Sequence, residues 1–516
     1  MSLLYREEDE PVISVSDDTY KDLALHELCN AISTDSSNQE LIQSVFSKIP
    51  TGYETITYRQ AILQDFLDKK EMCDELEIIL EKLNTLKEFK SHRRMDADRK
   101  SSIWELLDYL QELEVYTETV EDMDRVLQLY APKSQGLTEI AQRVHKIIID
   151  GQLEELRTAL SGLRADISTT KSMTFGVNFT PDLYPQDVVI MGFHNAKIMP
   201  KMTLKDQYDN RFLKNGQFGI RDPLLDTLTR EIEGHMAKEM RRMKRVFRDY
   251  ISLDGYFLVE LCSELQYYLL MARFERKLKA SGNPICMPVL SYDSQSVNMQ
   301  GVYNIRLAID GEEQIVRNDF VFSKEERIYI LTGPNRGGKT MLTQGIGIAA
   351  FMASQGLFVA AEKYEGFPFD RILTHFPADE NETVNFGRLG EEAIRIQQIV
   401  KEADEHSLVL LNETYSTTCA SDGLYLAKDL VHVLKNRNIP CIYNTHIHAL
   451  ARMTDEMNRW EGTSAVISII MEIVDNENTF RVLRSEPDTS SYARNVALAY
   501  GITYEQMMGI EQQGVT

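Results

Sequence analysis

Residues 333–340 have the residue types and spacing of a phosphate-binding loop. They read GPNRGGKT and fit the pattern G-x-x-x-x-G-K-[ST]. Glycines in such a loop let successive main-chain N–H groups surround phosphate oxygens, and the start of the following helix adds a favourable dipole. Lys339 would then reach the β- and γ-phosphates of ATP, and the Thr340 hydroxyl would hold Mg²⁺. The predicted nucleotide-binding residues are Gly333, Asn335, Gly337, Gly338, Lys339 and Thr340.

A second apolar segment ends in side chains suited to holding a cation and activating water. Residues 407–411 read SLVLL, and Asn412 and Glu413 follow. In nucleotide hydrolases a carboxylate at the first of these positions usually stands in the Mg²⁺ shell, and one at the second polarises the attacking water. The Asn412 amide is neutral, so it can bind a metal-bound water but holds the cation less strongly. We therefore expect Thr340 and Asn412 at the metal, Glu413 as the catalytic base, and slow Mg²⁺-dependent hydrolysis.

A third segment places a histidine where it could contact the same phosphates. Residues 407–411 and residues 441–444, which read CIYN, are both predicted to be strands, and the second leads to Thr445 and His446. A histidine at the carboxyl end of a parallel strand beside a phosphate loop can hydrogen-bond the γ-phosphate, so His446 is the second predicted catalytic residue. The alternative is a structural histidine whose ring is satisfied by its neighbours.

The segments around these residues predict the elements that would position them. A strand over residues 327–331 precedes the loop, and a helix over 341–353 follows it. From about residue 284 onward short apolar strands alternate with helices, which is typical of an α/β domain with a largely parallel sheet. The apolar run 345–361 favours a buried helix that continues into a strand, not a membrane span.

The preceding part of the chain is predicted to be mainly helical. Residues 20–170 contain little Pro or Gly and repeat apolar residues at three- and four-residue steps, as at Leu76, Ile79, Leu80 and Leu83. Residues 175–193 indicate strands and turns, and residues 224–278 are helical again. The fold class is therefore multidomain, α plus α/β: a long helical body with a small β-containing insertion, then a C-terminal α/β domain; the family resemblance given below implies that these are a lever or core and an ABC-type P-loop ATPase domain. The predicted domains are 1–170, 171–223, 224–283 and 284–516.

Composition and charge narrow the function classes. The chain has 516 residues, a formal net charge of −23 and 43% hydrophobic residues. This is ordinary globular composition, and the acidic balance argues against a protein that coats nucleic acid indiscriminately. Six widely spaced cysteines support neither a zinc site nor a disulfide framework. The first residues carry no signal-peptide pattern, so we expect a cytoplasmic protein with no membrane partner.

These segments together resemble the MutS family of ABC-type ATPases. The loop is similar to that family's GPNxGGK[ST] sequence, whose Pro-Asn is unusual among phosphate loops. The other similar segments are Asn318-Asp319, Val359–Glu362, Leu408–Gly423, Thr445-His446, Ser491-Tyr492 and Val496-Ala497, with weaker likeness at Tyr58–Asp65 and Leu258–Leu278. The resemblance implies an ATPase that uses ATP and Mg²⁺ and forms a homodimer with composite ATP sites.

Three departures from the family pattern bear on function. The chain begins almost directly in the segment that resembles the helical core, so we expect no mismatch-reading wedge domain. Asn412 replaces the expected Asp. The family's Ser-Thr signature, which reaches across the dimer, corresponds here to residues 387–392, which read GRLGEE and lack the hydroxyls. Gly390 at a helix start could still offer main-chain N–H groups to a γ-phosphate.

Two basic clusters could contact DNA phosphates without reading sequence. A solvated helix face is the alternative interpretation of each. The first cluster, beside the predicted β insertion, is Lys238, Arg241, Arg242, Lys244, Arg245 and Arg248. The second is Lys87, Lys90, Arg93, Arg94, Arg99 and Lys100.

The leading hypothesis is an ATP-binding and ATP-hydrolysing protein that dimerises through its ATPase domains and binds or clamps structured or mismatched DNA in repair or recombination. A second hypothesis is a nucleotide-switched protein-interaction module of the same family that has lost DNA binding. A third, the nucleotide-binding subunit of a membrane transporter, is disfavoured by the long helical N-terminal part.

Overall fold

The computed structural model describes residues 2–6, 10–95, 103–183, 185–197, 223–250, 257–376, 388–416, 418–474, 477–487 and 501–508. The chain forms two compact units. One joins Met1–Asp68 to Gln266–Thr516, and the other is Lys69–Leu265. These divisions fall at other residues than the predicted domain boundaries, which stay predictions.

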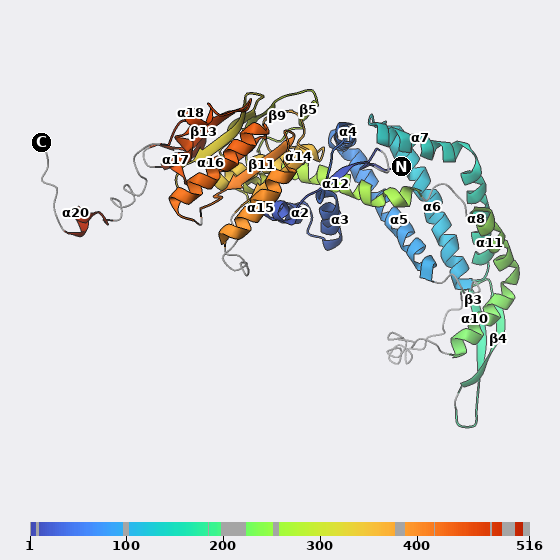
Figure 1. The fold of residues 1–516 in the computed structure, drawn as a ribbon. Coiled ribbons are helices and arrows are strands. Elements are labelled where there is room, and N and C mark those ends of the chain that lie inside the picture. The colour runs from blue at the N-terminus through green and yellow to red at the C-terminus, as the bar shows by residue number, and fades with distance from the viewer. Residues whose placement is uncertain are drawn as a thin grey trace. The chain divides into compact units, whose positions relative to one another are not determined.

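The unit Lys69–Leu265 is built from long helices and one hairpin (Figure 1). Leu76, Ile79, Leu80 and Leu83 are all buried, which follows from their helical spacing. The predicted strand-and-turn segment is confirmed as an antiparallel pair, β3 with β4. The elements are α5 (Lys70–Met95), α6 (Ile103–Tyr130), α7 (Gln135–Ile149), α8 (Gln152–Ser168), β3 (Ser172–Phe179), β4 (Pro185–His194), α10 (Pro223–His235), α11 (Ala237–Tyr250) and the first part of α12 (Phe257–Ala280).

The other unit begins with short N-terminal elements and continues after α12. The N-terminal elements are β1 (Val12–Ser14), α1 (Asp17–Asp22), α2 (Leu25–Ile32), α3 (Ser36–Phe46), β2 (Lys48–Pro50) and α4 (Tyr53–Asp68). The strands after α12 are β5 (Val289–Leu290), β6 (Val297–Val302), β7 (Asn318–Phe322), β8 (Glu326–Thr332), β9 (Lys363–Gly366), β10 (Arg371–His375), β11 (Ser407–Asn412), β12 (Cys441–Asn444), β13 (Ala465–Val474) and β14 (Glu477–Arg484). The helices there are α13 (Ile305–Ile309), α14 (Lys339–Ser354), α15 (Arg388–Glu402), α16 (Ala420–Asn436), α17 (His448–Ala451), α18 (Thr454–Met457) and α20 (Tyr504–Met507).

The main sheet has the order β10-β11-β12-β8-β13-β14. Its first five strands run parallel, and β14 is antiparallel to β13, so the predicted largely parallel sheet is confirmed. Strand β11 is buried along its whole length, as expected for a parallel strand covered on both faces. Ile328, Val409 and Tyr443 pack with residues of α15 and α16 on one face, whereas α14 contacts β11 and β12.

A second sheet has the order β5-β9-β6-β7. It packs aromatic side chains of β7 against the main sheet, with the Phe320 and Tyr329 ring centroids 4.7 Å apart. The predicted strand at the end of the run 345–361 is wrong. The helix ends at Ser354, and the buried segment that follows makes only an isolated bridge between Val359 and Cys286. Other main-chain groups of this segment bond outside any strand pair, as the Leu357 N–H does with the Met352 oxygen of α14 and the Ala360 oxygen with the Tyr303 N–H.

None of the helices in the described ranges is long and apolar enough to cross a membrane.

Candidate functional site

The phosphate loop connects β8 to α14 through two glycines with positive φ. Gly333 has φ +148° and Gly338 has φ +89°, conformations that L side chains rarely adopt. A Cβ atom on Gly338 would lie 2.9 Å from Phe480. Gly338 is also the N-cap of α14, and no side chain bonds the amides of the first turn. The start of the helix therefore carries uncapped N–H groups that an anion could accept bonds from.

The Lys339 side chain folds back over the loop. Its Nζ donates to the main-chain oxygens of Gly333 at 3.1 Å and Pro334 at 3.0 Å. Burial lowers the pKa of the Lys339 ammonium, and the Glu413 carboxylate opposes that shift. An anion bound in the loop would stabilise the charged ammonium further.

Asn412 contacts the Thr340 hydroxyl and is itself contacted by a second asparagine, Asn444. Asn412 ends β11 and stands in register with Asn444 at the end of β12. The Asn412 Oδ1 atom accepts a bond from the Thr340 hydroxyl at 3.2 Å and another from the Asn444 side-chain amide. The Asn444 Oδ1 atom is buried and has no hydrogen-bond partner in the part of the chain that the structure describes. Two neutral side-chain amides thus lie together at the position where the family pattern has a carboxylate.

Glu413 follows in a strained conformation. Its φ is +53°, which is uncommon for a residue with a side chain. Its Oε1 atom lies 2.9 Å from Nε2 of His446, and its Oε2 atom is buried without a hydrogen-bond partner among the described residues. An unsatisfied carboxylate oxygen of this kind can accept a proton from a water molecule.

Lys339, Thr340, Glu413 and His446 line one cavity of about 530 Å³. One wall is the phosphate loop and the start of α14, and Glu413 and His446 line it as well. A further wall comes from the β6–α13 segment and from the residues before β7, including Tyr303, Asn304 and Val316. A cavity of this volume, with apolar walls and a few converging polar groups, suits a small organic ligand.

Two family models match long parts of the chain. The model for MutS domain V matches residues 329–513, and the model for the MutS2 N-terminal domain matches residues 51–281. The first covers the phosphate loop and the segments that end in Glu413 and His446. The second covers most of the helical part. The chain belongs to the MutS family.

Individual MutS-family relatives are similar over parts of their length. A DNA mismatch repair protein MutS of Clostridioides difficile is 24% identical over 442 residues, which is 83% of this chain and 43% of the relative. An Endonuclease MutS2 of Thermus thermophilus is 35% identical over 135 residues, or 26% of this chain and 18% of the relative. An Endonuclease MutS2 of Caldicellulosiruptor saccharolyticus is 24% identical over 276 residues, or 52% and 33%. Each alignment thus covers less than half of the relative.

The MutS-family fold brings most of the predicted site residues to the cavity. Those that line it are Asn335, Gly337, Gly338, Lys339, Thr340, Glu413 and His446. Gly333 and Asn412 are not part of the lining but contact it, Gly333 through Lys339 and Asn412 through Thr340. Their roles toward a nucleotide stay predictions.

Three predicted segments are described only in part or not at all. Gly387 and residues 491–497 lie outside the described residues. Within α15, the Glu392 carboxylate accepts a bond from the Tyr415 N–H at 3.1 Å. This side chain of the predicted dimer-spanning segment therefore bonds a residue of its own chain. In the second basic cluster, Arg99 and Lys100 also lie outside the described residues.

Sequence reasoning missed other residues at the cavity. Asn444 was visible as the last residue of a predicted strand, and strand order would have placed it beside Asn412. Phe480 reaches Gly338 from β14 with φ +58°, and nothing in its local sequence signals that position. The Phe480 main-chain oxygen accepts a bond from Asn318 at 3.1 Å, and the Val482 N–H donates to the same asparagine at 2.8 Å. Asn318 therefore holds the β14 segment against the loop.

Proposed function

We propose that this MutS-family chain binds ATP with Mg²⁺ and hydrolyses it. The supporting observation is the single cavity that has Lys339 and Thr340 on one wall and the Glu413–His446 pair on another. Lys339 would leave its two main-chain acceptors and bind the β- and γ-phosphates. Glu413 would accept a proton from the attacking water through its unsatisfied oxygen, and His446 would orient that carboxylate or contact the γ-phosphate.

The donor set fits a cation that arrives with the nucleotide. In the described part of the chain no three His, Cys, Asp or Glu side chains converge as a metal site. Mg²⁺ in nucleotide sites usually keeps waters and phosphate oxygens and takes only one or two protein ligands. Thr340 and Asn412 already lie in contact, so they would hold the ion through a hydroxyl and an amide oxygen. When bound, Mg²⁺ would neutralise charge developing on the phosphates.

We further propose dimerisation through the ATPase domains and binding of structured or mismatched DNA. The basic face of α11 supports the DNA proposal. Lys238, Arg241, Lys244 and Arg245 are exposed on α11, whereas Met243 is buried. Proteins that neutralise phosphates with such a face bind in a salt-dependent, sequence-independent way. The proposed contacts are Lys238, Arg241, Arg242, Lys244, Arg245 and Arg248.

A nucleotide-switched interaction protein without DNA binding is the second candidate. The ion pair between Arg242 and Asp166 favours it, because a guanidinium engaged within its own unit has less charge to offer to phosphate. The Asn412–Asn444 amide pair favours it as well, since weak hold on the cation suits slow turnover.

The ATPase rate, measured with and without branched, mismatched and homoduplex DNA at low and moderate salt, tests the proposal. We expect Mg²⁺-dependent turnover that structured DNA stimulates, with stimulation that fades as salt rises.

The R241Q/K244Q/R245Q variant should lose most DNA retention. The slope of log affinity against log salt concentration should become shallower by about one for each lost phosphate contact. The matched control K324Q/K401Q/R459Q alters exposed basic residues elsewhere and should bind DNA normally. Turnover that no DNA alters would favour the second candidate, and absence of any turnover would contradict both hydrolysis and this mechanism.

Restoring a carboxylate at position 412 should make the site bind Mg²⁺ more tightly. In Asn412→Asp the side chain would keep its acceptor for Thr340 and Asn444 and gain a negative charge, so the Mg²⁺ concentration for half-maximal ATPase activity should fall about tenfold. Titrating Mg²⁺ at fixed ATP measures this. The isosteric Asn438→Asp, on a surface turn, is the control. An unchanged Mg²⁺ midpoint in Asn412→Asp would mean that the amide already suffices.

A further inference from the structure

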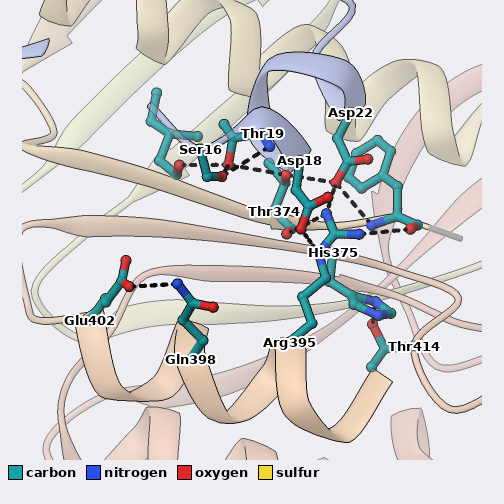
Figure 2. Close-up of polar contacts among 12 residues, drawn as sticks. Ser16, Asp18, Thr19, Asp22, Thr374, His375, Arg395, Gln398, Glu402 and Thr414 are labelled. Carbon is teal, nitrogen blue, oxygen red and sulfur yellow. Dashed lines mark hydrogen bonds and ion pairs between the residues drawn. The ribbon is translucent and has the colours of Figure 1, made fainter. Parts of the chain in front are cut away.

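A polar network joins the N-terminal helix α1 to the edge strand of the main sheet (Figure 2). Its centre is Asp22, whose Oδ2 atom accepts three bonds. The donors are the Thr374 hydroxyl at 2.7 Å, the Phe376 N–H at 3.1 Å and the Arg395 Nη2 atom at 2.5 Å. The Asp22 main-chain oxygen also accepts a bond, at 2.8 Å, from the side-chain amide of Gln344 on α14. Helix α1 thus contacts both β10 and the helix that carries the phosphate loop.

Arg395 connects this network to α15. Its Nε atom lies 3.0 Å from Asp18, and its Nη2 atom also donates to the Thr374 main-chain oxygen at 3.0 Å. Figure 2 shows the side chain extending from α15 toward Asp18 and Asp22 of α1. A planar guanidinium can satisfy acceptors on different elements at once, which a lysine cannot do with the same geometry. One side chain therefore fixes α15 against α1 and β10.

The same helix holds the loop after the predicted base. Glu392 lies three residues before Arg395, and its carboxylate accepts the Tyr415 N–H. Tyr415 has φ +64°, so this loop, like Glu413, keeps an uncommon backbone conformation. Such conformations persist only where neighbouring groups determine them.

A second connection reaches the loop from β10. The His375 Nδ1 atom lies 2.9 Å from the Thr414 hydroxyl, and the His375 side chain is buried. Burial lowers the pKa of His375 to about 4, and the nearby Arg395 cation acts in the same direction, so the ring is neutral at neutral pH. Thr414 and Tyr415 are thus both held by residues next to the Asp22–Arg395 pair.

We propose that Arg395 is a positioning residue for ATP hydrolysis, which it supports by fixing α15 and β10 so that Glu392 and His375 hold the Glu413–Tyr415 loop. This inference rests on the proposed ATPase function. Arg395 lines no part of the nucleotide cavity, so its loss should slow the chemical step and leave nucleotide binding unchanged. Misplacing a catalytic group by about 1 Å can cost on the order of a hundredfold in rate.

The test measures kcat, KM and the affinity for a fluorescent ATP analogue with Mg²⁺ in the full chain. We expect Arg395→Gln to lower kcat about tenfold while the nucleotide Kd changes less than twofold. Arg395→Lys, which keeps the charge, should recover part of the lost rate. Arg371→Gln is the matched control: it removes a half-buried guanidinium from strand β10 that pairs with Asp404 at 3.4 Å and takes no part in the Asp22 network, so it should leave kcat unchanged.

A double-mutant cycle tests whether Arg395 acts through Glu392 on α15. If Arg395 acts through α15, adding Glu392→Ala to Arg395→Gln should reduce kcat by less than the product of the two single effects. Multiplicative effects would overturn that route. Should Arg395→Gln fail to fold, Asp22→Asn, which keeps an acceptor oxygen but removes the charge, carries the same measurement.

The measurements distinguish failure of the ATPase proposal from failure of the positioning role of Arg395. A wild-type chain without turnover contradicts the ATPase proposal itself. A wild-type chain that hydrolyses ATP, with Arg395→Gln folded and within twofold of its kcat, overturns the positioning role. Loss of folding in both Arg395→Gln and Asp22→Asn, or a parallel loss of nucleotide affinity and melting temperature, would assign Arg395 to stability alone and also overturn it.

Discussion

Replacing Glu413 with glutamine is expected to stop ATP turnover and to preserve ATP binding. The amide keeps the size of the side chain and can still contact His446, but it cannot accept a proton from water. Loss of a general base commonly costs a factor of 10² to 10⁴ in rate, so we expect kcat to fall at least about a hundredfold. Because the substitution leaves the phosphate loop and Lys339 unchanged, the Kd for ATP should stay within about threefold.

Steady-state phosphate release and a fluorescent-nucleotide titration measure the two quantities. Glu405→Gln makes the same chemical change at an exposed side chain of the same unit and serves as the control. Normal hydrolysis by Glu413→Gln would show that another group activates the water, and His446 would then be the first candidate to examine.

Replacing Lys339 with alanine should abolish ATP binding at ordinary concentrations. The ammonium is the only lysine group lining the described cavity, and it would supply the positive charge for the β- and γ-phosphates. Alanine also leaves the Gly333 and Pro334 oxygens without their present donor, which would loosen the loop. Together these effects should weaken ATP binding by about a hundredfold or more, because 2.8 kcal/mol of lost charge-assisted bonding is roughly two decades of affinity.

The same titration, performed on Lys339→Ala and on the exposed-lysine control Lys324→Ala, measures this loss. Melting curves of both variants keep a folding defect apart from a binding defect. If Lys339→Ala binds ATP with wild-type affinity, the main-chain N–H groups and Mg²⁺ hold the phosphates without the lysine.

Local sequence was sufficient for the parts of the site that are contiguous. The residues 441–444 were predicted as a strand and form β12 with those bounds, and the predicted strand over 407–411 is β11 with one more residue, Asn412. Uninterrupted β-branched and aliphatic runs give this signal because parallel strands are buried on both faces. The loop glycines were predictable because glycine is the residue that most readily adopts the positive φ values found there.

The contacts between distant segments were not predictable in this way. Asp22 and Arg395 are 373 residues apart, and each has the local appearance of a solvent-exposed helix residue. Their pairing depends on α1 lying at the edge strand β10, which no periodicity encodes. The grouping of residues 1–68 with the unit that contains the phosphate loop was missed for the same reason, because a helical pattern predicts a helix but not what the helix packs against.

The discontinuity of that unit has a consequence for how the chain is made on the ribosome. Its first 68 residues emerge before Lys69–Leu265, and the partners of α1, on β10, α14 and α15, emerge later still. At 5–20 residues per second, synthesis of the intervening unit alone takes roughly 10–40 s. During that interval the apolar side chains of α2 and α4 have no native surface from the later segment to pack against. The N-terminal segment therefore waits for the intervening unit to be synthesised before it can complete its core, and we expect chaperones to bind it on nascent chains during that interval.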